Sequence, residues 1–202
     1  MKRRHGTILK LFVGNMGCGK TDRLIHEVEK KRKYGKKKVI VFRPTEDKRS
    51  KPGRINSRTG HGLKAFEVPG ADPRRVWKIL RKKERSMHEK FDIVVLDEIQ
   101  FFRKDPAFFR LVNKLLKKGY DIMAGGLVLD FRGEQFGPTL WLVLMAMDKV
   151  VRLDSCCTKC GEDAIFTQRM IKGKPAPHNS PLIMTNAKYE PRCFNCYEFP
   201  KK

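Results

Sequence analysis

The chain has 202 residues, of which 40% are hydrophobic and 33% charged, enough apolar material for a buried core and too much for wholesale disorder. Lysine and arginine total 45 against 22 acidic residues, and this formal charge of +23 favours polyanionic partners: nucleic acid, nucleotides or acidic membranes. No apolar run approaches the ~20 residues that cross a bilayer, and the basic start lacks a secretion-signal cleavage site, so we expect a cytoplasmic protein.

Short apolar runs alternate with amphipathic stretches along the first two thirds of the chain. The apolar runs predict strands at residues 8–13, 39–42, 93–96, 122–124 and from 150 onward. Helices are predicted at residues 21–34 and after three proline-containing starts: Asp72-Pro73, Asp105-Pro106, and Pro138 for a helix through Met147. Residues 43–62 have no hydrophobic period and predict a long functional loop. We therefore expect an α/β fold with a parallel sheet covered by helices on both faces.

A phosphate-binding motif, G-x-x-x-x-G-K-[ST], lies between the first predicted strand and the first predicted helix. It consists of Gly14, Asn15, Met16, Gly17, Cys18, Gly19, Lys20 and Thr21. In this context the glycines let the backbone wrap a phosphate, and the amides at the helix start point at the anion. We expect the Lys20 ammonium to bind the β- and γ-phosphates of ATP and the Thr21 hydroxyl to hold Mg²⁺. The motif predicts a sheet of the P-loop NTPase type.

Two adjacent acids, Asp97 and Glu98, follow the predicted strand at residues 93–96. In P-loop proteins an apolar strand that ends in Asp supplies a second contact to Mg²⁺, so Asp97 is predicted to reach the metal directly or through water. Glu98 is then the candidate general base for a hydroxyl group that receives a phosphoryl group.

The composition changes near Asp154, where cysteines, proline-rich loops and short alternating runs begin. We expect residues 1–153 to form the nucleotide-binding domain and residues 154–202 a small zinc-ribbon-like domain. Residues 172–181, rich in Gly and Pro, predict a turn that follows an apolar strand at residues 165–171.

Four cysteines of this second domain have the spacing of metal ligands. They form two Cys-x-x-Cys pairs: Cys157 with Cys160, and Cys193 with Cys196. Four thiolates suit a closed, structural zinc site rather than a catalytic one. Residues 161–192 separate the pairs, a longer stretch than the ~15–20 residues of an ordinary double-knuckle ribbon. Cys156 is a neighbouring thiol that would compete as a ligand.

Together these motifs resemble the type II (cellular-type) thymidine kinases from about residue 7 to residue 197. Beyond the phosphate motif, the resemblance is carried by an Asp-x-Arg pair and by segments at the strand ends and in the insert: Asp47 and Arg49, residues 97–102 (DEIQFF), residues 126–137 (GLVLDFRGEQFG), residues 167–169 and residues 189–193. The resemblance implies transfer of the ATP γ-phosphate to the 5′-hydroxyl of thymidine, with deoxyuridine as a secondary substrate. It also implies a homotetramer and a small zinc domain that carries a lid, or lasso, loop.

The resemblance assigns roles by position as well. Glu98 would accept the proton, and Asp97, Gln100 and Arg132 would join the phosphate motif at ATP. Residues 180–184 would form a lid strand whose backbone hydrogen-bonds the base, with Asp47 and Arg49 in a flexible loop nearby. The nucleoside would be bound by Met16, Phe101, Phe131, Phe136, Ser180, Pro181, Leu182, Ile183, Met184 and Tyr189.

Three segments depart from the family pattern: Gly17 replaces an aromatic residue, Cys18 replaces Ser, and residues 183–186 replace a Gly pair. Loss of glycine stiffens the lid and adds side chains near the nucleoside, so the base preference can differ from the family's. One alternative is a weakened relative that is kept for binding. Another is a P-loop ATPase whose zinc domain and positive charge bind nucleic acid. The segment at residues 126–137 favours the kinase, which requires neither nucleic acid nor a membrane.

Overall fold

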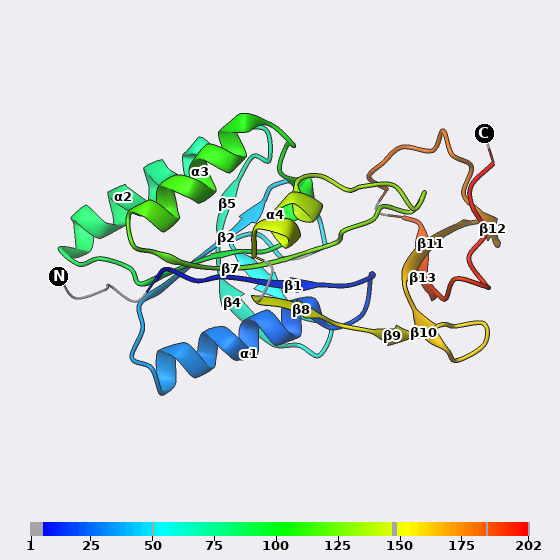
Figure 1. The fold of residues 1–202 in the computed structure, drawn as a ribbon, viewed down its shortest axis with the longest axis horizontal. Coiled ribbons are helices and arrows are strands. Elements are labelled where there is room, and N and C mark those ends of the chain that lie inside the picture. The colour runs from blue at the N-terminus through cyan, green and yellow to red at the C-terminus, as the bar shows by residue number, and fades with distance from the viewer. Residues whose placement is uncertain (1–5, 50, 147–148, 185, 202) are drawn as a thin grey trace.

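The computed structural model describes residues 6–49, 51–146, 149–184 and 186–201. Six strands form one sheet in the order β5-β2-β6-β7-β1-β8, and every neighbouring pair is parallel (Figure 1). The strands are β1 Leu9–Val13, β2 Val39–Pro44, β5 Phe66–Val68, β6 Ile93–Leu96, β7 Asp121–Gly126 and β8 Val150–Arg152. The predicted parallel sheet is confirmed, and β5 is an edge strand that the sequence patterns did not indicate.

Helices cover both faces of this sheet (Figure 1). They are α1 Lys20–Lys33, α2 Arg74–Met87, α3 Pro106–Lys117 and α4 Thr139–Ala146, with a short 3₁₀ helix at Ile99–Phe101. One core cluster joins the sheet to α2, α3 and α4 through residues such as Leu80, Phe108 and Leu142. A second cluster joins the opposite face to α1 through Leu24 and Val28. Within the described residues, no helix has the length and apolarity that crossing a membrane requires.

The predicted helix starts differ in detail. Asp105 caps α3, because its side chain accepts hydrogen bonds from the backbone N–H groups of Ala107 (2.8 Å) and Phe108 (3.1 Å). At α2 the cap is Pro73 and the helix begins one residue later than predicted, while Asp72 pairs instead with two arginines. Helix α4 is described to Ala146, and the predicted end at Met147 lies outside the described residues.

The predicted loop at residues 43–62 contains a β-hairpin instead of irregular chain throughout. Strands β3 (Arg54–Asn56) and β4 (Gly62–Lys64) pair in antiparallel fashion. Ile55 and Leu63 are buried in the core cluster of α1, which fixes the hairpin on that face of the sheet. A three-residue strand with one buried position is too short to show a hydrophobic period, so the sequence pattern could not reveal it.

After β8 the chain leaves the parallel sheet and forms small antiparallel sheets at one end of the molecule (Figure 1). β9 (Ser155–Cys156) pairs with β10 (Asp163–Ala164). β11 (Phe166–Ile171) lies between β12 (Lys174–Pro175) and β13 (Lys188–Arg192). The ring of Phe166, on β11, stacks on the ring of Tyr197 in the C-terminal segment, with 4.3 Å between the ring centroids.

Candidate functional site

The phosphate loop joins β1 to α1 at the carboxyl edge of the parallel sheet. Gly19 caps α1 with φ of +83°, a left-handed conformation that glycine adopts without steric cost. The Lys20 side chain is buried, and its ammonium donates a 2.5 Å hydrogen bond to the carbonyl oxygen of Asn15 within the same loop. The ammonium therefore lies over the loop, where it can exchange this carbonyl for a phosphate oxygen.

The two residues predicted to hold Mg²⁺ lie together. The Thr21 hydroxyl donates to the carboxylate of Asp97 at 3.4 Å, across the gap between α1 and the end of β6. Burial, and after it the charge of Glu98, raises the pKa of Asp97 to about 7. A buried carboxyl beside a hydroxyl has the oxygen donors that a hard divalent cation takes, so these residues fit the ion that accompanies ATP.

Glu98 is held rigidly in an uncommon backbone conformation. Its φ of +49° is left-handed, and its side chain is almost fully buried. One carboxylate oxygen lies 2.5 Å from the guanidinium of Arg49, and the other accepts a hydrogen bond from the Gln100 amide. Burial would raise the pKa of Glu98, but the charges of Arg49 and Lys20 outweigh burial and lower it. Glu98 is thus an ionised acceptor at the phosphate loop.

Two cavities adjoin at this edge of the sheet. The first, of about 450 Å³, lies over the phosphate loop and includes Lys20, Thr21, Asp97 and Glu98 in its wall. The second, of about 240 Å³, is lined mainly by apolar and aromatic side chains. The cavities share five lining residues: Met16, Asp47, Arg49, Arg58 and Leu127. A ligand with a flat apolar part and a hydroxyl can therefore fill the second cavity and reach the phosphate cavity.

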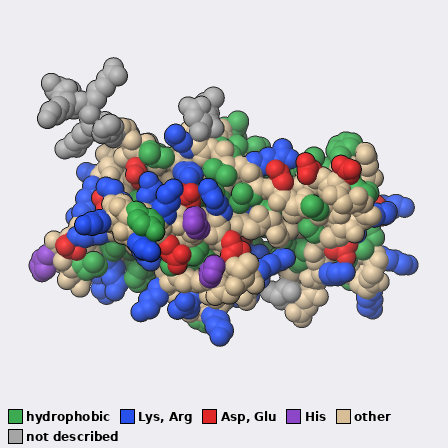
Figure 2. All heavy atoms as spheres, turned by 90° about the horizontal axis from the view of Figure 1, so that it is seen from below, with side chains coloured by type: hydrophobic (Ala, Val, Ile, Leu, Met, Phe, Trp, Pro, Cys, Tyr) green, Lys and Arg blue, Asp and Glu red, His purple; other side chains and the backbone are tan. Residues whose placement is uncertain are grey.

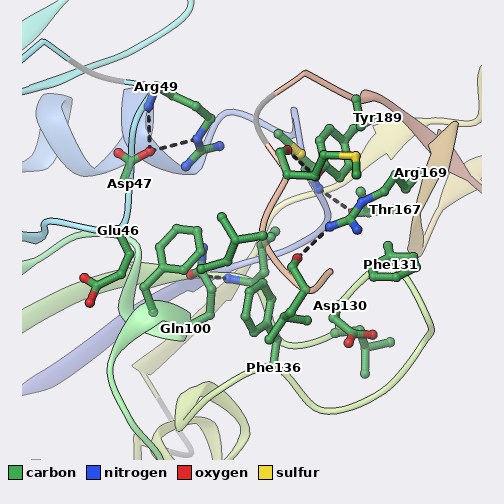
Figure 3. A pocket seen from close by; sticks show the side chains of 18 of the residues that line it. Glu46, Asp47, Arg49, Gln100, Asp130, Phe131, Phe136, Thr167, Arg169 and Tyr189 are labelled. Carbon is green, nitrogen blue, oxygen red and sulfur yellow. Dashed lines mark hydrogen bonds and ion pairs between the residues drawn. The ribbon is translucent and has the colours of Figure 1, made fainter. Parts of the chain in front are cut away.

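Aromatic rings and Arg169 pack together in the wall of the second cavity (Figure 3). Phe101 and Phe136 meet edge to face, with ring centroids 5.6 Å apart. The guanidinium of Arg169 lies 3.8 Å from the centroid of Phe131 and 5.2 Å from that of Tyr189. Gln100, predicted to contact ATP, lines this cavity and accepts a hydrogen bond from the N–H group of Leu127 at 3.1 Å.

Residues 180–184, predicted as a lid strand, are not in a strand, and side chains donate hydrogen bonds to several of their carbonyl groups. Arg169 donates to the carbonyls of Pro181 and Leu182, the latter at 2.6 Å, and the Tyr189 hydroxyl donates to Met184 at 2.7 Å. Three of the predicted nucleoside contacts in this segment line the second cavity: Leu182, Ile183 and Met184.

Several predicted site residues lie outside both cavities. Ser180 and Pro181 line neither of them, and Thr185 of the departing segment lies outside the described residues. Arg132, predicted near the phosphates, instead donates to the carbonyls of His178 and Ser180, both at 2.8 Å. Gly14, Asn15 and Cys18 of the phosphate motif shape the loop without lining either cavity.

The phosphate loop is hydrogen-bonded to the C-terminal region. The Asn15 side chain donates to the Ala164 carbonyl at 3.1 Å and accepts from the Ser155 hydroxyl at 2.8 Å. The N–H group of Met16 donates to the Thr167 hydroxyl at 2.9 Å. The two predicted domains thus share the wall of the site, and β11 contributes Thr167 and Arg169 to the second cavity.

Four cysteines gather at the base of this region. The sulfur atoms of Cys157, Cys160, Cys193 and Cys196 all lie within 4.8 Å of one another, so they are placed to hold a metal ion. Burial would raise the pKa of Cys157, but backbone hydrogen bonds, the largest from Cys193, lower it to about 6. A thiol that ionises readily among three others suits a soft cation. Cys156 is exposed and outside the cluster.

The sequence assigned no site role to four of the lining residues: Glu46, Arg58, Thr167 and Arg169. Thr167 and Arg169 nevertheless belong to a segment that carries the family resemblance. Arg169 left a signal, since it is a charged residue within the apolar run at residues 165–171. The structure buries this side chain almost fully, which is rare for arginine. Arg58 left none, because an exposed arginine in a polar loop is ordinary.

A family model and a curated relative point to the same family of enzymes. The family model described as thymidine kinase matches residues 7–197. A protein named thymidine kinase from Thermococcus kodakarensis is 37% identical over 196 residues, covering 96% of this chain and 95% of its own length.

Among solved structures the similarity is weak. The genome packaging NTPase B204 of Sulfolobus turreted icosahedral virus 2 has a TM-score of 0.47 at 14% identity, covering 74% of this chain and 75% of its own. The replication initiator DnaA with AMPPCP and single-stranded DNA has a TM-score of 0.41 at 17% identity, covering 75% of this chain and 41% of its own. The match of the family model over nearly the whole chain, together with the identity to the Thermococcus protein, shows that this chain belongs to the thymidine kinase family of ATP-dependent nucleoside kinases.

Proposed function

We propose that the protein transfers the γ-phosphate of ATP to the 5′-hydroxyl of thymidine, with deoxyuridine as a weaker substrate. One observation carries the proposal: a cavity over the phosphate loop adjoins a cavity lined by aromatic rings. A pyrimidine base in the aromatic cavity would direct the sugar towards Glu98, which lies in the wall of the phosphate cavity.

In the proposed step the 5′-oxygen forms a bond to the γ-phosphorus while the bond from that phosphorus to the β–γ bridging oxygen breaks. ADP leaves with the bonding electrons, and the hydroxyl proton passes to the carboxylate of Glu98. Lys20 would bind the β- and γ-phosphates, and Thr21 and Asp97 would hold the Mg²⁺ that neutralises phosphate charge. The wall formed by residues 182–184 would exclude water, which otherwise competes as the acceptor.

Glu98 accepts a hydroxyl proton only if one of its two bonded partners gives way. Gln100 is buried, whereas the Arg49 side chain is 44% exposed and lines both cavities. Arg49 is therefore the partner that would turn from Glu98 towards the phosphates when ATP enters. Its departure would also remove the positive charge that lowers the pKa of Glu98 and would make the carboxylate a better base.

The test is ADP release with Mg²⁺ across thymidine, deoxyuridine, deoxycytidine and purine deoxynucleosides, with a single-stranded oligonucleotide as a further arm. We expect thymidine to give the highest turnover, deoxyuridine less, and purines near background. Stimulation by the oligonucleotide and by no nucleoside would overturn the proposal in favour of a nucleic-acid-dependent ATPase.

The surface charge does not favour that alternative on the face drawn in Figure 2. There acidic side chains lie among the basic ones, and the basic residues do not form a single continuous track.

Arg169 is expected to set nucleoside affinity, because it fixes residues 181–182 and stacks on Phe131 in the same cavity. Arg169→Lys keeps the charge and loses the planar pair of donors. We predict that it raises KM for thymidine about tenfold, the effect of losing ~1.5 kcal/mol of charged hydrogen bonding, with ATP affinity nearly unchanged. Arg152→Lys, on β8, is the matched control. Equal KM values for the two variants would contradict the role of Arg169.

Three further expectations complete the proposal. The ion at the four cysteines is zinc, since four thiolates with a buried pair suit a structural tetrahedral site. The protein acts in the cytoplasm, where thiols stay reduced. It assembles as a homotetramer, as the family resemblance implies, and light scattering of the purified protein would measure this directly.

A further inference from the structure

We propose that Arg58, at the tip of the β3–β4 hairpin, is a phosphate-binding residue that the hairpin delivers over the phosphate loop. The proposal rests on the proposed function and deepens it, because it adds a cationic group to the machinery that receives ATP. Four observations on the hairpin and the loop below it support the assignment.

The first observation is the position of the guanidinium. Arg58 lines the phosphate cavity together with Lys20, Thr21 and Glu98, and it also lines the aromatic cavity. It therefore lies where the two cavities meet, which is where the γ-phosphate must pass from nucleotide to nucleoside. Of the basic residues in the two cavity walls, Arg49 and Arg58 are the two that both cavities share.

The second observation is the space above Gly17. A Cβ atom built at Gly17 would lie 3.1 Å from an Nη atom of Arg58, and its three nearest neighbours would all be guanidinium atoms of that residue. The guanidinium thus lies close to Gly17 of the phosphate loop. A Cβ atom at this position would require the guanidinium to shift by a few tenths of an ångström, and a large side chain would displace it further.

The third observation is that Arg58 is without a partner among the residues that the structure describes, which give it neither a hydrogen bond nor an ion pair. Arg49, its neighbour in both cavities, is bonded to the carboxylates of Asp47 and Glu98. A guanidinium offers five N–H donors in a planar fork that matches phosphate oxygens. Arg58 can therefore bind an arriving phosphate without first breaking an ion pair.

The fourth observation is that the hairpin tip is fixed. Thr59 donates a hydrogen bond to Asp22 in the first turn of α1, and the Ser57 and Thr59 hydroxyls lie 2.9 Å apart. The strand before the tip is anchored by Ile55, which is fully buried against α1. Because both the tip and the base are held, the guanidinium stays near the phosphate loop, and binding phosphate costs little further ordering.

The test compares Arg58→Ala, Arg58→Lys and the matched control Arg54→Ala. Arg54 lies on β3 of the same hairpin, is exposed and lines neither cavity, so its loss removes the same charge without touching the site. The first readout is titration with a non-hydrolysable ATP analogue and Mg²⁺ in the absence of nucleoside. The second is kcat for thymidine phosphorylation, with and without added guanidinium chloride.

We expect Arg58→Ala to lower the affinity for the ATP analogue about tenfold or to lower kcat about 10²-fold. The second figure is the usual effect of removing one preorganised donor to a reacting group. Guanidinium should restore part of the lost turnover, Arg58→Lys should lie between, and Arg54→Ala should match the wild type. Arg58→Ala and Arg54→Ala within twofold of each other in both readouts would overturn the proposal. So would a loss that neither lysine nor guanidinium restores, because that result indicates collapse of the hairpin. If the wild type phosphorylates no nucleoside, the proposed function fails, and the analogue titration alone still decides the role of Arg58.

Discussion

Replacing Glu98 by Gln is expected to lower kcat by roughly 10²–10⁴ while nucleotide affinity changes little. The substitution keeps the shape of the side chain and removes the carboxylate that would accept the 5′-hydroxyl proton. Glu98 is nearly fully buried at the end of β6, in a left-handed backbone conformation that a side chain of the same size preserves. The amide still bonds Gln100, so the fold around the site should survive.

Two measurements separate loss of the base from damage to the site. Titration of Glu98→Gln with an ATP analogue and with thymidine should give affinities within a few-fold of the wild type. Arg49, released from its ion pair with Glu98, should bind phosphate at least as well as before. Turnover equal to that of the wild type would remove Glu98 from the role of base, and loss of both ligands would show that it is structural.

Removal of the metal from the four cysteines should abolish thymidine binding and weaken ATP binding less. Cys157 follows β9 and Cys193 follows β13, so a metal held by the four cysteines would tie the ends of both small sheets together. β11 and β13 carry Thr167, Arg169 and Tyr189 into the nucleoside cavity. Structural zinc contributes ~10–16 kcal/mol to the folding of small sites, so these strands should not hold their positions without it.

ATP binding should also weaken somewhat, because the phosphate loop is hydrogen-bonded to the C-terminal region that the metal would support. Asn15 bonds Ala164 and Ser155, and Met16 bonds Thr167. The parallel sheet has its own core clusters and should stay folded. The measurement is paired titration of thymidine and an ATP analogue after chelation and for Cys193→Ser with Cys196→Ser, with circular dichroism of the sheet.

Cys156→Ser is the matched control for the cysteine variants, because Cys156 is exposed and lies outside the cluster. It should bind both ligands as the wild type does. Equal loss of thymidine and ATP binding with the sheet intact, or loss of neither, would contradict a metal that supports the nucleoside side of the site.

The parts of the fold that local sequence patterns determine were predictable. Apolar runs of four to six residues gave the strands buried on both faces, such as β6. The proximity of Thr21 and Asp97 was also predictable, because each follows the carboxyl end of a parallel strand, and those ends lie at one edge of the sheet. Edge strand β5 and the β3–β4 hairpin escaped prediction, since three-residue strands carry no measurable period.

The nucleoside side of the site was predicted by resemblance rather than by pattern, and its details depend on tertiary contacts. Arg132 lies within the segment at residues 126–137 that resembles the family, yet its guanidinium donates to the carbonyls of His178 and Ser180 in the insert. The resemblance implies a lid strand at residues 180–184, but side chains of Arg169 and Tyr189 donate hydrogen bonds to carbonyl groups there. Such side-chain-to-backbone bonds join residues far apart in the chain and leave no local signal.

Product analysis with ATP labelled at the γ-phosphorus tests the central claim most directly, using thymidine, 3′-deoxythymidine and 5′-deoxythymidine as acceptors. The account predicts that label appears in the 5′-monophosphates of thymidine and 3′-deoxythymidine. It also predicts no labelled nucleotide from 5′-deoxythymidine, which lacks the hydroxyl that Glu98 would deprotonate. Label released only as orthophosphate with all three acceptors, or transferred to 5′-deoxythymidine, would contradict it.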